Sequence, residues 1–234
     1  MSACKVEVKD YICTVTIDRP PANATSKETY DEIRDTFYAL DRREDIKVVI
    51  LTGASKIFMA GNELSEFGEF MEPSKCTVHY DRIRNAYLAV KNCRYPVIGA
   101  INGSAAGAGC AFAGCCDVLI AAQGAKFALS EIKVGIIGAD GYASLMVPEK
   151  VLRYMVVPRE QVLEEAQKLA AEFAQNARRA LILWKQCLNE NYEHELPKKF
   201  NNNLQATIAY QPYHDFKEAS TAFIEKRVPE YDEQ

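Results

Sequence analysis

The sequence predicts an α/β fold, with a core of repeated strand, loop and helix turns in residues 1–150 and a helical region in residues 151–234. Two continuous apolar runs, at residues 48–53 and 96–101, are typical of strands that are buried on both faces. Segments with apolar residues at helical spacing lie between and after these runs. Units that recur in this order predict a core built of successive turns.

The N-terminal stretch predicts two strands and then a helix. Residues 5–18 alternate in short stretches between apolar and polar side chains, which indicates two strands arranged as a hairpin. Ser26 precedes a segment with helical spacing that extends to Leu40. Glu28 and Asp31 place negative charge near its start, where the helix dipole favours an acid.

The later elements follow from the same patterns. Helices are expected at residues 80–92 and 110–116, short strands at 118–121 and 126–127, and helices again over 160–187 and 216–226. The half of the chain after residue 150 therefore reads as all-helical. A helical appendage of this kind often serves contacts between subunits, and we assign it that role as a hypothesis.

Composition and charge limit the classes of protein to which this chain can belong. The chain has 234 residues, of which 48% are hydrophobic and 26% charged, and this balance is typical of a globular protein with a sizeable core. A formal net charge of −4 provides no field that would hold a nucleic-acid backbone, whereas a phosphorylated cofactor fits it better. The sequence shows no membrane-length apolar run and no signal-peptide region after Met1, so we expect a cytoplasmic protein that binds neither nucleic acid nor membrane.

The cysteines and histidines show no pattern of a metal or disulfide site. Eight cysteines lack paired C-x-x-C spacing, and several lie in apolar runs where cysteine behaves as a small hydrophobe. We therefore expect reduced, structural thiols and no metal site. The three histidines, His79, His194 and His214, lie in polar stretches and are expected at the surface.

A glycine-rich segment, Gly103-Ser104-Ala105-Ala106-Gly107-Ala108-Gly109, follows the second buried strand. By itself it indicates a tight connection from strand to helix, in which glycines permit positive φ angles and close packing. It differs from the G-x-G-x-x-G pattern of dinucleotide sites and lacks the Lys-Ser/Thr of a phosphate-binding loop. A second segment, Met59-Ala60-Gly61-Asn62, follows the first buried strand.

Several short motifs of this chain occur together in one known family. They are Gly53 with Phe58-Met59-Ala60-Gly61-Asn62-Glu63-Leu64, Asn102-Gly103 with Gly107 and Gly109-Cys110, Cys116-Asp117, Lys126-Phe127-Ala128-Leu129-Ser130-Glu131-Ile132, Asp18-Arg19-Pro20 with Asn23, and Phe223-Ile224-Glu225-Lys226-Arg227. With these motifs, the chain resembles the crotonase (enoyl-CoA hydratase/isomerase) superfamily nearly from end to end.

The resemblance implies a crotonase-like α/β fold, with a core of repeated ββα turns that binds acyl-CoA in residues 1–150 and a C-terminal helical region that serves oligomerisation in residues 151–234. It also implies an acyl-CoA thioester as substrate, with coenzyme A as part of that substrate and no tightly bound cofactor. The expected assembly is a homotrimer or a dimer of trimers. One stretch departs from the family, because the chain runs from Met155 directly into Val156-Val157-Pro158, where the family inserts a helix and a turn that close over the acyl pocket.

The resemblance assigns two backbone donors to the reaction. The amides of Asn62 and Ala108 would hold the oxyanion of a thioester enolate, and a preorganised donor of this kind contributes on the order of 3–4 kcal/mol. The family usually has a small apolar residue at position 62 and a glycine at position 108. Both residues of this chain are therefore departures, but both keep the N–H group.

Contacts with the coenzyme also come from the resemblance. The Ala60 carbonyl would bind the adenine, and Gly61 and Gly107 would line the coenzyme. Phe223 and Lys226 would touch the coenzyme of a neighbouring subunit. Without the family, these last two residues are one core phenylalanine and one solvated lysine of a helix.

Family hydratases use two glutamates, and this chain keeps one of them. The first falls at Ala111, and the second falls at Glu131, where partial burial beside an apolar segment would raise its pKa toward that of a general base. Without the family, Glu131 is a solvated or capping glutamate. A lone glutamate resembles the Δ3,Δ2-enoyl-CoA isomerases, which shuttle one proton between two carbons. Asp140, in Gly138-Ala139-Asp140-Gly141, is either a turn residue or a second acid/base.

Three functions remain open from the sequence. The favoured one is an isomerase-like acyl-CoA enzyme in which Glu131 moves the proton. The second is an enoyl-CoA hydratase or dehydratase that acts on an unusual acyl group and uses Asp140 in place of the lost glutamate. The third is an acyl-CoA-binding protein without turnover, to which Ala111 and the absent segment both point.

Overall fold

The computed structural model describes residues 2–129, 154–190 and 195–231, and the predicted catalytic residues Glu131 and Asp140 lie outside these ranges. Its centre is a six-stranded sheet with the order β1-β2-β4-β7-β9-β11. The strands are β1 (Cys4–Lys9), β2 (Ile12–Ile17), β4 (Val48–Gly53), β7 (Val97–Ile101), β9 (Val118–Ala122) and β11 (Tyr154–Val157). Strands β1 and β2 pair antiparallel, and the other pairs are parallel.

Two small parallel sheets lie beside the main one and carry the candidate site. The larger has the order β10-β8-β5 and the smaller pairs β3 with β6. Their strands are β3 (Ala24–Thr25), β5 (Ile57–Met59), β6 (Gly61–Asn62), β8 (Ser104–Ala106) and β10 (Phe127–Ala128). Both sheets therefore consist of the short segments that follow strands of the main sheet.

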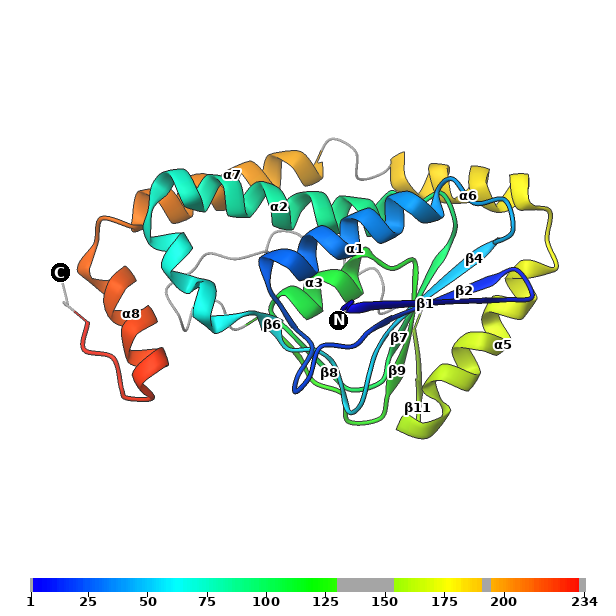
Figure 1. The fold of residues 1–234 in the computed structure, drawn as a ribbon, viewed down its shortest axis with the longest axis horizontal. Coiled ribbons are helices and arrows are strands. Elements are labelled where there is room, and N and C mark those ends of the chain that lie inside the picture. Colours follow the sequence, from blue (N-terminus) through cyan, green and yellow to red (C-terminus); the bar gives the residue numbers. More distant parts are fainter. Residues whose placement is uncertain (1, 130–153, 191–194, 232–234) are drawn as a thin grey trace.

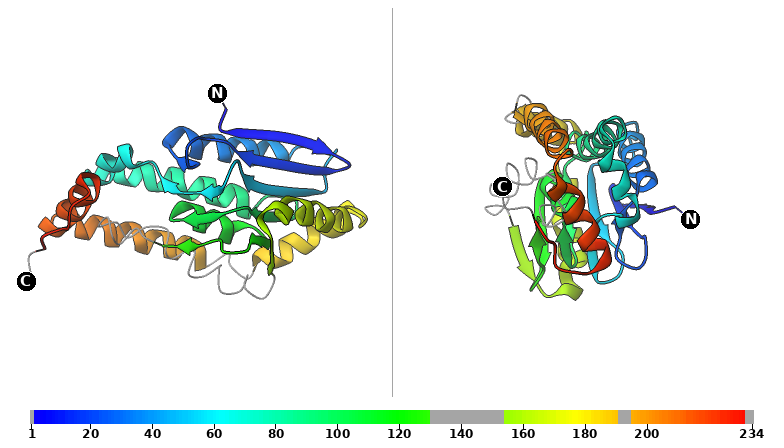
Figure 2. Two further views of the ribbon diagram at one scale, coloured as in Figure 1. Left: turned by 90° about the horizontal axis from the view of Figure 1, so that it is seen from below. Right: turned by 90° about the vertical axis from the view of Figure 1, so that its left-hand side faces the viewer.

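The helices form a layer on each face of the main sheet. α1, α2 and α3 cover one face and α5 covers the other, and α7 runs beside α2 (Figures 1 and 2). The described helices are α1 (Lys27–Leu40), α2 (Pro73–Lys91), α3 (Ala108–Cys115), α5 (Val162–Ala174), α6 (Arg178–Glu190), α7 (Glu195–Tyr210) and α8 (His214–Glu225), with the 3-10 helices η1 (Leu64–Met71) and η4 (Arg159–Gln161).

The strand at the centre of the sheet is buried on both faces, as its continuous apolar sequence predicts. Every residue of β4 is buried. Val49 and Leu51 belong to the core cluster that includes α1, α2 and α3, whereas Val48 and Ile50 belong to the cluster that includes Val162 and other α5 residues. The alternation arises because successive side chains of a strand point to opposite faces.

The C-terminal half differs from the all-helical reading in two ways. Residues 154–157 form the strand β11, which pairs with β9 and extends the main sheet. The expected helix over residues 160–187 is two helices, because the chain turns between Ala174 and Arg178. Helix α5 contacts β4, β7 and β9, so the first described part of residues 151–234 adds to the core sheet. The oligomerisation role of this half stays a prediction.

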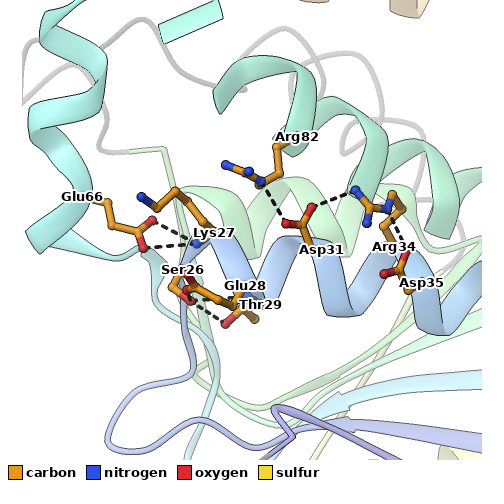
Figure 3. A network of polar contacts seen from close by, with 9 residues as sticks. All are labelled: Ser26, Lys27, Glu28, Thr29, Asp31, Arg34, Asp35, Glu66 and Arg82. Atoms are coloured by element: carbon orange, nitrogen blue, oxygen red, sulfur yellow. Dashed lines mark hydrogen bonds and ion pairs between the residues drawn. The ribbon is translucent and has the colours of Figure 1, made fainter. Parts of the chain in front are cut away.

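The start of α1 is fixed by side chains from two other elements (Figure 3). Ser26 is its N-cap, and the Ser26 hydroxyl accepts a hydrogen bond from the Thr29 amide. The Glu66 carboxylate of η1 accepts a hydrogen bond from the Lys27 amide, with an oxygen 3.0 Å from the nitrogen. Asp31 forms an ion pair with Arg82 of α2 at 3.1 Å. The first turn of α1 is therefore tied to η1 and to α2.

Seven of the eight cysteines are buried, as the sequence predicts for small hydrophobes. Burial raises the pKa of Cys4 and Cys93 to about 12, so these two thiols are protonated at neutral pH.

The prediction for His79 is wrong, because this residue is buried in α2 and its ring packs edge-on against Tyr30. Within the described residues, no helix is both long and apolar enough to cross a bilayer.

A buried ion pair joins α6 to the end of α3. Lys185 Nζ lies 2.6 Å from Asp117 Oδ2, and the two side chains are 2% and 1% exposed. The same carboxylate oxygen accepts a hydrogen bond from the Val97 amide at the start of β7. Asp117, a short acid between a helix and a strand, therefore has a structural role.

We predict that Lys185→Met destabilises the protein by about 3–5 kcal/mol, because the change leaves the Asp117 carboxylate buried without its cation. Urea denaturation followed by circular dichroism measures the loss of unfolding free energy. Lys168→Met is the matched control: Lys168 is 56% exposed and pairs with Glu164 and Glu165 on the surface, so its loss costs less than about 1 kcal/mol. Equal losses in the two variants would contradict the prediction.

Candidate active site

The two segments that the sequence singles out lie side by side. Strand β5 pairs with β8 in parallel, with Ile57 opposite Ser104 and Met59 opposite Ala105. The segment 59–62 therefore runs along the segment 103–109. A Cβ atom placed on Gly61 would lie 3.0 Å from the Ala106 carbonyl oxygen and 3.7 Å from the Ala108 nitrogen. The structure thus brings Gly61, which precedes Asn62, close to the Ala108 nitrogen.

Two glycines make this approach possible. A Cβ atom on Gly109 would lie 2.2 Å from the Met59 carbonyl oxygen, a distance that real Cβ atoms essentially never show. Gly61 has a φ angle of +101°, which side chains rarely tolerate. Backbone contacts backbone at this point, and no side chain separates the two segments.

Ala108 is the first residue of α3, and Gly107 is its N-cap, with a φ angle of +50°. The amides of Cys110 and Ala111 donate to the Gly107 carbonyl oxygen. In a helix that begins at Ala108, the Ala108 amide has no acceptor within the helix, and the positive end of the helix dipole lies at the same place. The arrangement offers one N–H group and a favourable potential to an anion.

Asn62 lies in β6, where it is half-buried and opposite Thr25 of β3. Its side-chain oxygen accepts a hydrogen bond from the Tyr30 hydroxyl, and the Thr25 hydroxyl donates to the Gly61 carbonyl oxygen at 3.0 Å. Neither Tyr30 nor Thr25 is among the residues that the sequence motifs single out. Asn62 itself indicated that a polar partner must exist, because the family usually has a small apolar residue at this position. A half-buried carboxamide there needs a hydrogen-bond partner.

Two neighbouring charged and polar residues are structural. Arg19 Nη1 lies 2.7 Å from Glu63 Oε2, and the hydrogen bond from Arg19 lowers the pKa of the Glu63 carboxyl. Glu63 is therefore an ionised, paired carboxylate beside Asn62. The Asn23 side chain is buried and donates to the backbone carbonyl of Ile57 at 2.9 Å, so it holds the loop before β5 in place.

The residues assigned to the coenzyme fall in two places. Ala60 is exposed, Gly61 and Gly107 are buried beside it, and all three belong to the paired segments. Phe223 is 43% exposed on α8, and Lys226 is the exposed residue that ends this helix with a φ angle of +57°. Helix α8 lies at one end of the molecule, beside η1 and away from β8 (Figures 1 and 2).

The position of the first family glutamate is fully buried and apolar. Ala111 lies in α3, one turn after Ala108, and is 0% exposed. Position 111 therefore supplies a methyl group and no carboxylate. Glu131 and Asp140 lie outside the described residues, so their predicted roles have no geometry to test them.

In the described part of the chain, no three His, Cys, Asp or Glu side chains are arranged to hold a metal ion.

Comparison with known proteins gives consistent matches. The chain matches the family model described as enoyl-CoA hydratase/isomerase over residues 7–154 and 152–234. A probable mitochondrial enoyl-CoA hydratase of Dictyostelium discoideum is 30% identical over 251 residues, covering 95% of this chain and 88% of that protein. A probable enoyl-CoA hydratase of Mycobacterium bovis is 30% identical over 250 residues, covering 97% and 96%. A solved enoyl-CoA hydratase from Mycobacterium avium subsp. paratuberculosis shares the fold, with a TM-score of 0.81, 23% identity and 99% of each chain covered.

The alignments also show where this chain is short. Both sequence alignments are longer than the chain of 234 residues, so the relatives have residues that this chain lacks. The two family matches meet at residues 152–154, next to Met155, where the sequence analysis expects an absent helix and turn. The expected join between Met155 and Val156 lies within β11.

We predict that Gly109→Ala destabilises the protein by about 1–3 kcal/mol, because the new methyl group would meet the Met59 carbonyl and force α3 away from β5. Denaturation in urea measures the loss. Gly68→Ala makes the same chemical change in η1, where a Cβ atom meets nothing within 4 Å, and serves as the control. A loss for Gly109→Ala no larger than that of the control would show that the close approach of the two segments is not required.

Proposed function

The chain belongs to the enoyl-CoA hydratase/isomerase family, and from this membership we propose that it moves a proton on the enolate of an acyl-CoA thioester. The proposal uses the backbone amides of Asn62 and Ala108 as donors to the thioester oxygen. Its support is the close approach of the two segments, in which a Cβ atom on Gly61 would lie 3.7 Å from the nitrogen of Ala108, the first residue of α3. Preorganised donors act where negative charge develops, so each is worth on the order of 3–4 kcal/mol in the transition state.

The reaction we favour is isomerisation with one glutamate. The Glu131 carboxylate removes a proton from C2 of a 3-enoyl-CoA, and the electron pair moves into a dienolate with its negative charge on the thioester oxygen. The same carboxyl group then returns the proton to C4, which gives the 2-enoyl-CoA. The observation that carries this choice is the buried Ala111, at the position that the resemblance assigns to the first glutamate of a hydratase.

We predict that Glu131→Gln lowers kcat at least about 10²-fold on the substrate that the wild type converts, because the amide cannot accept the proton. The measurement uses a panel of 3-enoyl, 2-enoyl and 3-hydroxyacyl-CoA thioesters. Glu7→Gln, an exposed glutamate of β1, is the control and should match the wild type. Equal rates in wild type and Glu131→Gln would exclude Glu131 from the reaction.

A hydratase is the second candidate, and the names of both sequence relatives favour it. In this reaction Asp140 would supply the acid/base that Ala111 cannot. If the enzyme isomerises, products formed in ¹⁸O-labelled water carry no ¹⁸O on the acyl chain, as mass spectrometry can show. Incorporation at C3 that is lost in Asp140→Asn would instead establish hydration.

Micromolar binding of coenzyme A thioesters with no product from the whole panel would favour a binding protein.

The same proposal includes the assembly and the location of the protein. A homotrimer or dimer of trimers would let Phe223 and Lys226 reach the coenzyme of a neighbouring subunit. Their exposure on α8, at one end of the molecule, supports this arrangement. The coenzyme would enter as part of the substrate, and a cytoplasmic location completes the proposal.

A further inference from the structure

The direction of the Asn62 N–H group is set by a hydrogen bond to the Gly61 carbonyl, which lies on the opposite side of the same peptide unit. The Gly61 carbonyl and the Asn62 N–H belong to one planar trans peptide, so they point in opposite directions. Thr25, which is fully buried in β3, donates its hydroxyl hydrogen to the Gly61 carbonyl at 3.0 Å. Because the carbonyl is held, the N–H group is aimed away from Thr25. A hydroxyl on β3 thus orients a proposed oxyanion donor on β6.

The side chain of Asn62 is held by a second hydroxyl. The buried Tyr30 phenol donates to Asn62 Oδ1, and its oxygen lies 3.2 Å from Thr25 Oγ1. Thr25 has a single hydroxyl hydrogen, and its shorter contact is the one to Gly61. The two hydroxyls therefore restrain Asn62 through its backbone and through its side chain.

The ring of Tyr30 reaches the other donor-bearing element. It stacks on Phe112 of α3, with the ring centroids 6.0 Å apart and 27° between the planes. Phe112 is four residues after Ala108, so the two residues lie on the same side of α3. Tyr87 of α2 packs edge-on against Phe112 at 4.6 Å and closes the cluster. Tyr30 thus touches both elements that carry the proposed amides.

Tyr30 can act in this way because its own backbone is fixed. Its amide donates to the Ser26 carbonyl at 3.0 Å, in the first turn of α1. The residues on either side of this turn are held by Glu66 at Lys27 and by Arg82 at Asp31 (Figure 3). The fixed first turn of α1 therefore holds the Tyr30 ring in place, and the ring in turn fixes the position of the Tyr30 hydroxyl.

We propose that Tyr30, together with Thr25, is a positioning residue that sets the direction and separation of the Asn62 and Ala108 amides. This inference rests on the proposed function, because it assumes that these amides bind a thioester oxygen. Tyr30 does not touch the substrate. It acts through Asn62 by a hydrogen bond and through α3 by its contact with Phe112.

Acetoacetyl-CoA tests this directly and without turnover. Its C2 proton dissociates to solvent and leaves an enolate with a near-ultraviolet absorbance, and donors aimed at the thioester oxygen shift this equilibrium toward the enolate. The fraction of enolate is measured at saturating protein over a range of pH. The variants are Tyr30→Phe, Thr25→Val, Asn62→Ala and the double variant Tyr30→Phe/Asn62→Ala. Tyr38→Phe removes one hydroxyl from the exposed face of the same helix and is the control.

We predict that Tyr30→Phe and Thr25→Val each lower the enolisation constant of the bound thioester about tenfold, as expected when a donor is misplaced by a fraction of an ångström. Tyr38→Phe should match the wild type. In the Asn62→Ala background, Tyr30→Phe should have almost no further effect, because the hydroxyl has lost the group it holds. A merely structural tyrosine would lower thermal stability without this pattern of coupling.

The outcomes separate the two ideas. If the wild type promotes enolisation and Tyr30→Phe does so equally, the positioning role is wrong and the proposed function stands. If effects of Tyr30→Phe and Asn62→Ala add independently, the hydrogen bond between them is not the route, and the inference is again wrong. If the wild-type protein binds acetoacetyl-CoA without promoting enolisation, the oxyanion site itself is wrong, and the proposed function fails with the inference.

Discussion

The close approach of two backbone segments is the constraint on which the rest of this structure depends. The segment 59–62 lies against the segment 103–109 with no side chain between them, because Gly61 and Gly109 have no Cβ atom to occupy the space. The parallel pairing of β5 with β8 sets the register of this contact. Everything proposed for the site follows from it, since only backbone groups this close can offer two amides to one oxygen atom.

The surrounding elements keep this contact in place from two directions. On one side, α1 begins in a turn fixed by Ser26 and Glu66, and it carries Tyr30 into the aromatic cluster above α3. On the other side, the Asp117–Lys185 pair joins the end of α3 and the start of β7 to α6. A buried pair of this kind is not a strong source of stability, but breaking it is costly, so it specifies where α6 must lie.

Some features of this region are shared with the family, and others are particular to this chain. The family fold brings the two amide-bearing segments together, and the match to known proteins covers nearly the whole sequence. Ala111 and the stretch that is shorter than in the relatives are features of this chain. So is the half-buried Asn62 side chain with its tyrosine partner. These features lie around the proposed oxyanion site and leave the N–H groups of Asn62 and Ala108 in the chain.

The sequence by itself determined the α/β class, both strands of the N-terminal hairpin, α1 with its Ser26 cap and the doubly buried strand β4, because each depends on local periodicity or capping. The crotonase-like fold followed from the resemblance of its motifs to a known family. The sequence also determined the two site segments, through short motifs. Only the tertiary structure decided the pairing of β11 with β9, the buried position of His79 and the contacts of Tyr30. Each of these joins residues that are distant along the chain, and no local pattern records which partner a buried polar group or an edge strand will meet.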